Sequence, residues 1–231
     1  MDKDNSQVRL NKFLAERLGM SRREADGAIA SGKVTVDDKR AVLGQRIDKS
    51  SKVCYNSMIV AFLPEYSYLA LNKPVGYVCS RKRQGDVPTV FELLPEKYQK
   101  LKTVGRLDKD SSGLILLTND GDFAFQMTHP KFVKEKHYIV TLNRGLEPLH
   151  QQMISDYGVE IGDGVSRMRL VSLNEKRMEF DVTLHEGRNR QIRRTFEALG
   201  YRVVKLHRIS FGKYELSGLR SGEWEEVPRV I

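Results

Sequence analysis

Cysteine and long apolar runs are scarce in this chain of 231 residues. Its two cysteines, Cys54 and Cys79, are far apart and form no Cys-x-x-Cys pair, which argues against a disulfide framework or a zinc ribbon. No apolar run is long enough to span a bilayer, and residues 1–7 are polar, unlike the apolar core of a signal peptide. We therefore expect a soluble, cytoplasmic protein without a membrane partner.

Motifs for metals and nucleotide cofactors are also missing. The chain has five histidines, and no two of them have the spacing that would place both on one helix face. The nearest imitation of a glycine-rich phosphate loop, Gly158 to Gly164, lacks the required spacing. We expect neither a metal nor a cofactor.

Positive charge, by contrast, is in excess. The chain carries 39 Lys and Arg against 30 Asp and Glu, a net charge of +9. This imbalance favours a polyanionic partner, because each contact between a basic side chain and a phosphate releases condensed counterions.

The first sixty residues have the pattern of two short helices followed by a small sheet. Apolar residues on one helical face predict a first helix from Arg9 to Gly19, where glycine is a natural stop. Ser21 to Glu24 has capping-box spacing and predicts a second helix that ends at Gly32. Strand-like residues follow at Val34–Val36 and Lys52–Tyr55. Basic residues are expected on the exposed positions, namely Arg9, Lys12, Arg22, Arg23 and Lys33.

This pattern, and the stretch SRREADGAIASGKVTVDDK in particular, resembles the alpha-L, S4-like RNA-binding module. The resemblance implies RNA contacts by Lys12, Arg22 and Arg23, although Asp26 interrupts the basic surface. The alternative is a helical hairpin with an ordinary solvated charged face. We expect this domain at residues 8–60, a linker at residues 61–67 with Pro64 as its breaker, and a second domain at residues 68–231.

The decapeptide GRLDKDSSGL places Asp108 between a flexible glycine and the apolar strand Leu114–Thr118. Loops held by buried strands often carry catalytic groups, whereas an isolated loop aspartate more commonly caps a turn. The decapeptide closely resembles the GRLDxD(S/T)xGL motif of ribosomal RNA pseudouridine synthases of the RsuA family. That resemblance implies that Asp108 is the catalytic residue. The phrase LNKPVGYVCS matches the family's first motif, and we expect Lys73 to have a structural role near the site.

The segment EGRNRQIRR resembles the family's third motif and opens a helix near Gln191. The resemblance implies that Arg193 reaches the catalytic aspartate, where a guanidinium would keep a carboxylate ionised and oriented. Arg188, Arg190 and Arg194 are expected to bind RNA. A basic helix face that only binds phosphate is the alternative for Arg193.

The segment KHYIVTL resembles the second motif, whose tyrosine, here Tyr138, packs against the target base. An ordinary core tyrosine is the alternative. A base within a helix must first be extruded, and Arg106 is a candidate to fill the vacated stack. We count Asp108, Tyr138 and Arg193 as the catalytic set.

Strands and helices alternate irregularly after the GRLDKDSSGL loop. We expect a helix at residues 122–128 and further strands at residues 136–142 and 178–184. This order favours an α+β fold in which helices flank a mixed, mainly antiparallel sheet, as the resemblance also implies.

The implied reaction is the isomerisation of uridine to pseudouridine in ribosomal RNA, free or in an assembly intermediate, by a monomer. SRREAD and GRLDKDSSGL look more similar to the enzymes of the family that act on the large subunit, and this resemblance favours the large subunit over the small one. Asp108 either attacks C1′ or removes the 2′ proton, because both steps need only an ionised carboxylate near the sugar.

Two other classes of function are consistent with parts of the sequence. A non-catalytic RNA-binding or ribosome-assembly factor would need the basic surfaces without the set Asp108, Tyr138 and Arg193. A glycosidase would need a second catalytic carboxylate, and we expect turn geometry to point Asp110 elsewhere.

Overall fold

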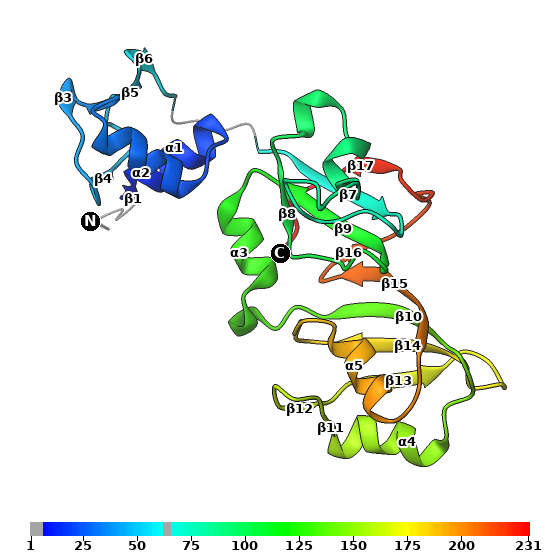
Figure 1. Cartoon of the computed structure of the whole chain (residues 1–231). Helices are drawn as coiled ribbons and strands as arrows, with labels where there is room; N and C mark the ends of the chain where they lie inside the picture. Colours follow the sequence, from blue (N-terminus) through cyan, green and yellow to red (C-terminus); the bar gives the residue numbers. More distant parts are fainter. Residues whose placement is uncertain (1–6, 62–65) are drawn as a thin grey trace. The chain divides into compact units, whose positions relative to one another are not determined.

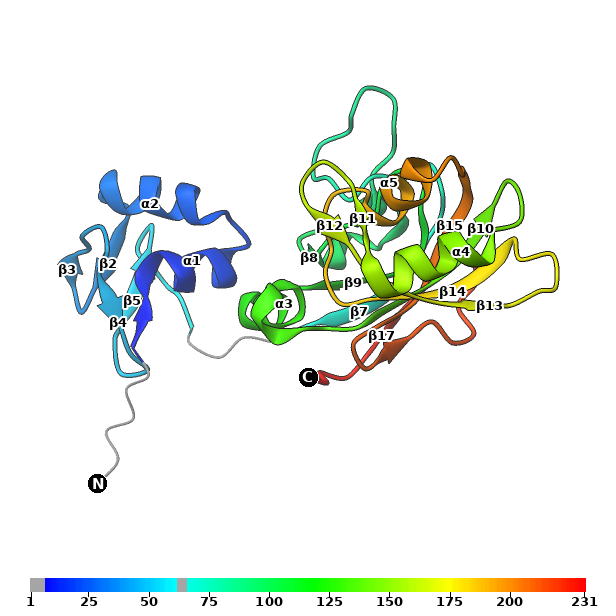
Figure 2. The same ribbon diagram turned by 90° about the horizontal axis from the view of Figure 1, so that it is seen from below.

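The computed structural model describes residues 7–61 and 66–231. Most of the expected linker at residues 61–67, Pro64 included, lies outside them. The chain divides into two compact units, one reaching to Ser67 with residues Asn119–Gly121 added, and one made of residues 68–118 and 122–231 (Figures 1 and 2). Over the described ranges, no helix combines the length and apolar character needed to cross a membrane.

The helices of the N-terminal unit begin within one residue of the predicted starts and end within two residues of the predicted stops. Helix α1, Leu10–Leu18, stops at Gly19, whose φ of 67° is left-handed. Helix α2, Arg22–Ala30, begins with the predicted capping box: the Ser21 side chain accepts the N–H of Glu24, and the Glu24 carboxylate accepts the N–H of Ser21. Both orphan N–H groups are thereby satisfied.

Short strands complete this unit. The sheet order is β3-β2-β5-β6, and β1 pairs separately with β4. Leu10, Leu14 and Ile29 are almost fully buried in its small core. The strands are β1 Val8–Arg9, β2 Val34–Val36, β3 Lys39–Arg40, β4 Arg46–Ile47, β5 Val53–Tyr55 and β6 Met58–Ile59.

The larger unit is built on one nine-stranded sheet with the path β13-β14-β10-β15-β9-β7-β17, to which β8 and β16 are added at β9 and β15. Among the described strand pairs of this sheet, β9–β15 alone is parallel, so the sheet is mixed and mainly antiparallel, as predicted. Its strands are β7 Tyr68–Lys73, β8 Lys102–Val104, β9 Ser112–Thr118, β10 Lys136–Leu142, β13 Arg169–Ser172, β14 Glu179–Leu184, β15 Val203–Phe211, β16 Tyr214–Glu215 and β17 Trp224–Glu226.

Helical segments and a hairpin lie around this sheet (Figure 2). The hairpin pairs β11, Val159–Glu160, with β12, Val165–Ser166. The helical segments are η1 Val90–Leu93, η2 Glu96–Tyr98, α3 Gly121–Thr128, η3 Pro130–Phe132, α4 Pro148–Gln152, the π-helical turn η4 Met153–Tyr157 and α5 Gln191–Ala198. Since helices and sheet alternate without a repeating βαβ order, the predicted α+β class is confirmed.

Alternate residues of β9 supply two cores on opposite faces of the sheet. Ile115 and Leu117 belong to the main core with Phe196 of α5, whereas Leu114 and Leu116 belong to a second core with Phe123 of α3. The helices α5 and α3 therefore cover opposite faces.

Gly113 allows the parallel pair to form at the centre of the sheet. Its φ is +103°, and a Cβ there would lie 2.2 Å from the carbonyl oxygen of Arg208 on β15. Only glycine permits this approach. The tight pairing fixes the start of β9, directly after the loop that carries Asp108.

Candidate active site

Asp108 opens a tight turn that is anchored from both sides. The carbonyl oxygen of Asp108 accepts the N–H of Ser111 at 3.1 Å, and the carbonyl oxygen of Lys109 accepts the N–H of Gly76 at 2.7 Å. At the end of the turn, Nζ of Lys73 donates to the carbonyl oxygen of Ser111 at 2.6 Å. The segment that matches the family's first motif therefore supports the turn. The Asp108 side chain itself is 33% exposed.

Lys73 is fully buried at the end of β7, and its ammonium also donates to the carbonyl oxygen of Pro74 at 2.9 Å. Burial lowers the pKa of Lys73 to about 8, against the partly compensating attraction of Cys79, Asp108 and Asp110. The Lys73 ammonium is thus close enough to Asp108 and Asp110 to be attracted by both. In the part of the chain that the structure describes, it forms no direct ion pair with either carboxylate.

Asp108 and Asp110 face the same arginine. Arg190 holds Asp110 with two parallel hydrogen bonds of 3.1 Å, from Nη1 to Oδ1 and from Nη2 to Oδ2. Its Nη1 is also 3.6 Å from Oδ2 of Asp108. The expectation that Asp110 points elsewhere is therefore wrong: the residue lies in the site and holds the arginines in place.

Arg193 is joined to the turn through Asp110 rather than Asp108. Its Nε lies 3.3 Å from Oδ2 of Asp110, its Nη2 donates to the Asp110 carbonyl oxygen at 2.8 Å, and its Nη1 donates to the Val203 carbonyl oxygen at 2.9 Å. Within the described ranges, Arg190 rather than Arg193 is at ion-pair distance from Asp108. The resemblance had implied that Arg193 itself reaches Asp108, and the geometry differs on this point.

Burial and the neighbouring arginines have opposite effects on the pKa of Asp110. Burial acts to raise the pKa of Asp110, but the hydrogen bond from Arg190 and the charges of Arg193 and Arg190 outweigh it, so this pKa lies below its ordinary value. Burial lowers the pKa of Arg193. The Asp110 carboxylate consequently stays ionised and keeps both guanidinium groups beside Asp108.

Tyr138 lies on β10 and is 7% exposed. It pairs in register with Arg208 of β15, and Arg208 pairs with Gly113 of β9. Two strand spacings of about 4.8 Å place the tyrosine about 10 Å from the start of β9. Tyr138 and the Asp108 turn therefore lie over neighbouring parts of one sheet.

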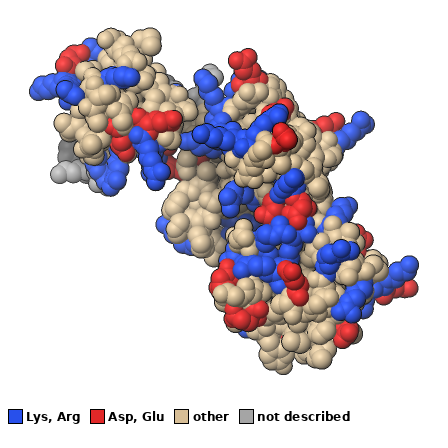
Figure 3. All heavy atoms as spheres, in the orientation of Figure 1, with Lys and Arg blue, Asp and Glu red and all other residues tan. Residues whose placement is uncertain are grey.

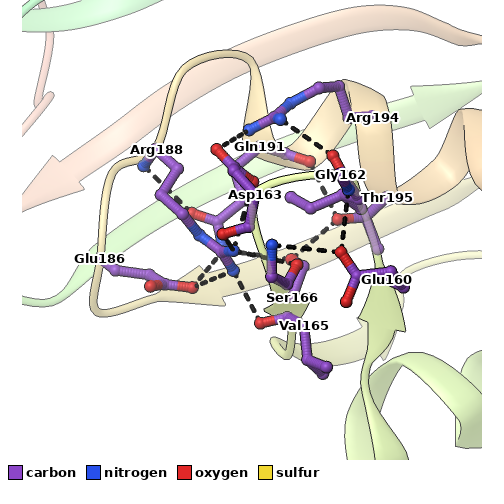
Figure 4. A network of polar contacts seen from close by, with 12 residues as sticks. Glu160, Gly162, Asp163, Val165, Ser166, Glu186, Arg188, Gln191, Arg194 and Thr195 are labelled. Atoms are coloured by element: carbon purple, nitrogen blue, oxygen red, sulfur yellow. Dashed lines mark hydrogen bonds and ion pairs between the residues drawn. The ribbon is translucent and has the colours of Figure 1, made fainter.

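Arg188 and Arg194 are bonded to the β11–β12 hairpin (Figure 4). Arg188 donates to the carbonyl oxygens of Gly164 at 3.1 Å and Val165 at 2.8 Å. Arg194 donates to the carbonyl oxygen of Ile161 at 3.0 Å and lies 2.9 Å from Oδ2 of Asp163. Each side chain is mostly covered, 21% and 29% exposed. These groups already have partners in the protein, so the expectation that both serve RNA is not supported by their surroundings.

Sequence reasoning missed the acceptor in this network. Asp163 pairs with Arg194 and lies 3.4 Å from Nη1 of Arg188. It stands at the tip of the hairpin in the sequence Gly-Asp-Gly, with Gly162 and Gly164 both at positive φ. An Asp between two glycines is a recognisable tight-turn signal that could have pointed to a side chain presented by a loop.

The remaining predicted RNA contacts have varied surroundings. Arg106, Arg22 and Arg23 are exposed, whereas Lys12 is half-buried with Nζ 3.9 Å from Glu16. Asp26 accepts hydrogen bonds from Asn11 at 3.0 and 3.2 Å, so it links α2 to α1. On the face of the larger unit shown in Figure 3, Lys and Arg side chains gather with carboxylates among them.

The site as a whole presents two partly exposed carboxylates on one turn: Asp110 is held by two arginines, and Asp108 is the one without a hydrogen-bonded guanidinium in the described part of the chain. Across the described ranges, no three His, Cys, Asp or Glu side chains come together as a metal site. Such a carboxylate can act as a nucleophile or as a general base toward a polyanionic ligand.

Two family models match this chain. The model described as RNA pseudouridylate synthase matches residues 67–198, and the S4 domain model matches residues 8–53. The chain therefore belongs to the RNA pseudouridine synthase family, in the RsuA group that carries an N-terminal S4 domain. It is an enzyme of the class that isomerises uridine in RNA.

Relatives of this group align over nearly the whole chain. Ribosomal large subunit pseudouridine synthase B of Bacillus subtilis is 35% identical, covering 95% of this chain and 91% of the relative. Ribosomal small subunit pseudouridine synthase A of Pasteurella multocida is also 35% identical, with coverages of 95% and 96%. A crystal structure of a pseudouridylate synthase matches with a TM-score of 0.69 and 32% identity, covering 96% of each chain.

Proposed function

We propose that this enzyme converts a uridine of ribosomal RNA to pseudouridine, with large-subunit RNA as the preferred substrate. The observation that carries the proposal is the Asp108 turn, in which a rigidly held, partly exposed carboxylate is flanked by Arg190. Relatives named for ribosomal RNA of both subunits support the substrate class.

In the proposed reaction the N1–C1′ bond of the uridine breaks, the uracil turns, and C5 bonds to C1′. The proton lost from C5 is balanced by one gained at N1, so no redox or hydrolytic partner is required. Asp108 acts on the ribose, as a nucleophile at C1′ or as the base for the 2′ proton. Tyr138 packs against the base, and Arg106 fills the vacated stack.

In this proposal Arg193 acts through Asp110. Three of its nitrogens contact Asp110 or the Val203 carbonyl, so it fixes the turn and adds positive charge beside Asp108. Arg190 contributes the nearer charge and remains a candidate for RNA phosphate, because 44% of its side chain is exposed. Arg188 and Arg194 instead hold the β11–β12 hairpin in place, because their guanidinium groups are bonded to its carbonyl oxygens and to Asp163.

The decisive experiment replaces the carboxylate with its near-isosteric amide. Asp108→Asn should fold and bind RNA normally but form no detectable pseudouridine, because the amide lacks the charge and nucleophilicity that either route needs. Large- and small-subunit ribosomal RNA would each be incubated with the enzyme and mapped by mass spectrometry. Asp156→Asn, an exposed aspartate on η4, is the matched control and should retain full activity. Near wild-type turnover by Asp108→Asn would refute the assignment.

The proposal assigns residues 8–60 to RNA binding, residues 61–67 to a linker and residues 68–231 to catalysis, in a cytoplasmic monomer. Arg22 and Arg23 are exposed at the start of α2, so their replacement by alanine should remove phosphate contacts. The slope of log affinity against log salt should fall by about two. Lys49→Ala, an exposed lysine of the same unit, should leave that slope closer to wild type.

A further inference from the structure

Three aromatic rings meet at the exposed end of α3, at residues that the reaction does not use. The Phe125 ring centroid lies 4.6 Å from that of His129 and 5.8 Å from that of Phe132. Phe125 is 47% exposed, although Phe123 and Met127 on the opposite side of the same helix are buried. The rings brace one another, so a large apolar surface is held in a fixed orientation in water.

A cation accompanies these rings. Nζ of Lys131 lies 4.7 Å from the Phe132 centroid and 5.7 Å from the Phe125 centroid. Aromatic faces combined with a cation suit a nucleotide, since the base stacks on a ring while the phosphate meets the ammonium. An apolar peptide would leave this ammonium without a counter-ion, and the net charge of +9 likewise favours a nucleic acid.

The cluster adjoins the catalytic loop. A Cβ built on Gly105 would lie 3.6 Å from Cγ2 of Thr128, the residue that precedes His129. Gly105 in turn stands three positions before Asp108 in the sequence. The end of α3 therefore packs against the start of the loop that carries Asp108, and the ring cluster follows directly on this contact in the chain.

The backbone that follows the cluster is strained. Val133 has a φ of 44° and is 61% exposed, a left-handed conformation that β-branched residues rarely adopt. Strained positions persist where the surrounding structure over-determines them, and they concentrate at ligand-binding segments.

We propose that Phe125, His129, Phe132 and Lys131 form a stacking site for an unpaired base of the RNA substrate, separate from the target uridine. The inference rests on the proposed function for its substrate. It assigns part of the RNA affinity to stacking, which is insensitive to salt, in addition to the salt-dependent phosphate contacts.

The test compares Phe125→Ala, Phe125→Trp and, as matched control, Tyr157→Ala, which removes a 70% exposed ring on η4. Two probes are used with the full chain: a large-subunit ribosomal RNA fragment and a short oligoadenylate, whose purines stack strongly. Phe125→Ala should weaken binding of both by about tenfold, equivalent to one base–aromatic stack, with an unchanged salt slope. It should raise KM without lowering kcat, whereas Phe125→Trp and Tyr157→Ala should behave like wild type.

The outcomes separate this site from the proposed function. Suppose that the wild-type enzyme forms no pseudouridine in ribosomal RNA, but that Phe125→Ala still weakens oligoadenylate binding. This result would support the stacking site and overturn the substrate proposal. Unchanged affinities in an active Phe125→Ala enzyme would overturn the stacking site alone. A defect seen only with ribosomal particles, and not with naked RNA, would also overturn it in favour of a protein partner.

Discussion

Four arginines lie just before α5 or in its first turn, and they are held by two different parts of the structure. Arg190 and Arg193 turn toward Asp110 in the catalytic turn, whereas Arg188 and Arg194 turn toward Asp163 and carbonyl groups of the β11–β12 hairpin. All four belong to one basic motif in the sequence. Their partners differ, however, so one set supports the chemistry and the other supports the shape of the domain.

This division follows from the helical geometry and from the supply of carboxylates. Each set has one aspartate that accepts from two arginines, Asp110 on the turn and Asp163 on the hairpin. Ordering a mobile arginine side chain when RNA binds costs conformational entropy. An aspartate that already holds the arginine in the free protein reduces this cost. The first turn of α5 is thereby fixed before RNA arrives.

Arg193→Ala should produce the largest effect of this comparison. The Arg193 side chain is 11% exposed; two of its guanidinium nitrogens contact Asp110 in the turn, and the third donates to the Val203 carbonyl oxygen on β15. Its removal leaves Asp110 with Arg190 alone, and losing charged hydrogen bonds of about 3 kcal/mol corresponds to about a hundredfold in kcat. Arg193→Lys should retain an intermediate rate, since one ammonium replaces only part of the fork. Single-turnover assays check both, and equal rates for Arg193→Ala and wild type would contradict the role.

Asp110→Asn should have the next largest effect. The amide still accepts one hydrogen bond but loses the charge that holds Arg190 and Arg193 beside Asp108. Because the Asp110 side chain is 46% exposed, solvent screens part of this loss, and we expect about a tenfold fall in kcat rather than abolition. Asp156→Asn is the control. Full activity in Asp110→Asn would show that the arginines keep their positions without it.

Much of this arrangement could be predicted from local patterns. The Ser21 capping box, the Gly19 stop, the strand Lys136–Leu142 and the loop position of Asp108 all depend on residues close together in the sequence, and the structure agrees with each. Local spacing was sufficient because capping, alternation and turn formation are short-range effects.

Pairings between distant segments could not be predicted in this way. Asp110 and Arg190 are eighty positions apart, so nothing local showed which of two nearby aspartates would receive the arginines. The hairpin strands Val159–Glu160 and Val165–Ser166 have two residues each, too few to display alternation. The burial of Lys73 was hidden because a lysine at a strand end ordinarily extends into water.

Arg194→Ala should have a smaller effect, on stability rather than chemistry. It removes the hydrogen bond to Ile161 and the ion pair with Asp163, which together contribute about 1 kcal/mol, or a fall of about 3 °C in Tm. The salt slope of RNA binding should be unchanged, because the side chain already has protein partners. A slope lowered by about one, with an unchanged Tm, would instead identify Arg194 as a phosphate contact and break the comparison.

The last effect is confined to alkaline pH and concerns Lys73, whose ammonium donates to the Ser111 carbonyl oxygen of the catalytic turn. Burial lowers the pKa of Lys73 from 10.5 to about 8, so the unfolded chain binds more protons than the folded chain between those two values. Stability attributable to this group must therefore rise as pH increases from about 8 toward 10, where the folded protein no longer holds a buried charge. Lys73→Met should flatten that rise, whereas Lys82→Met, at an exposed position, should leave it as in wild type. Urea unfolding at a series of pH values measures the difference, and an identical rise in Lys73→Met would show that the ammonium is not buried in solution. Such a result would leave the turn supported by Gly76 and the arginines alone.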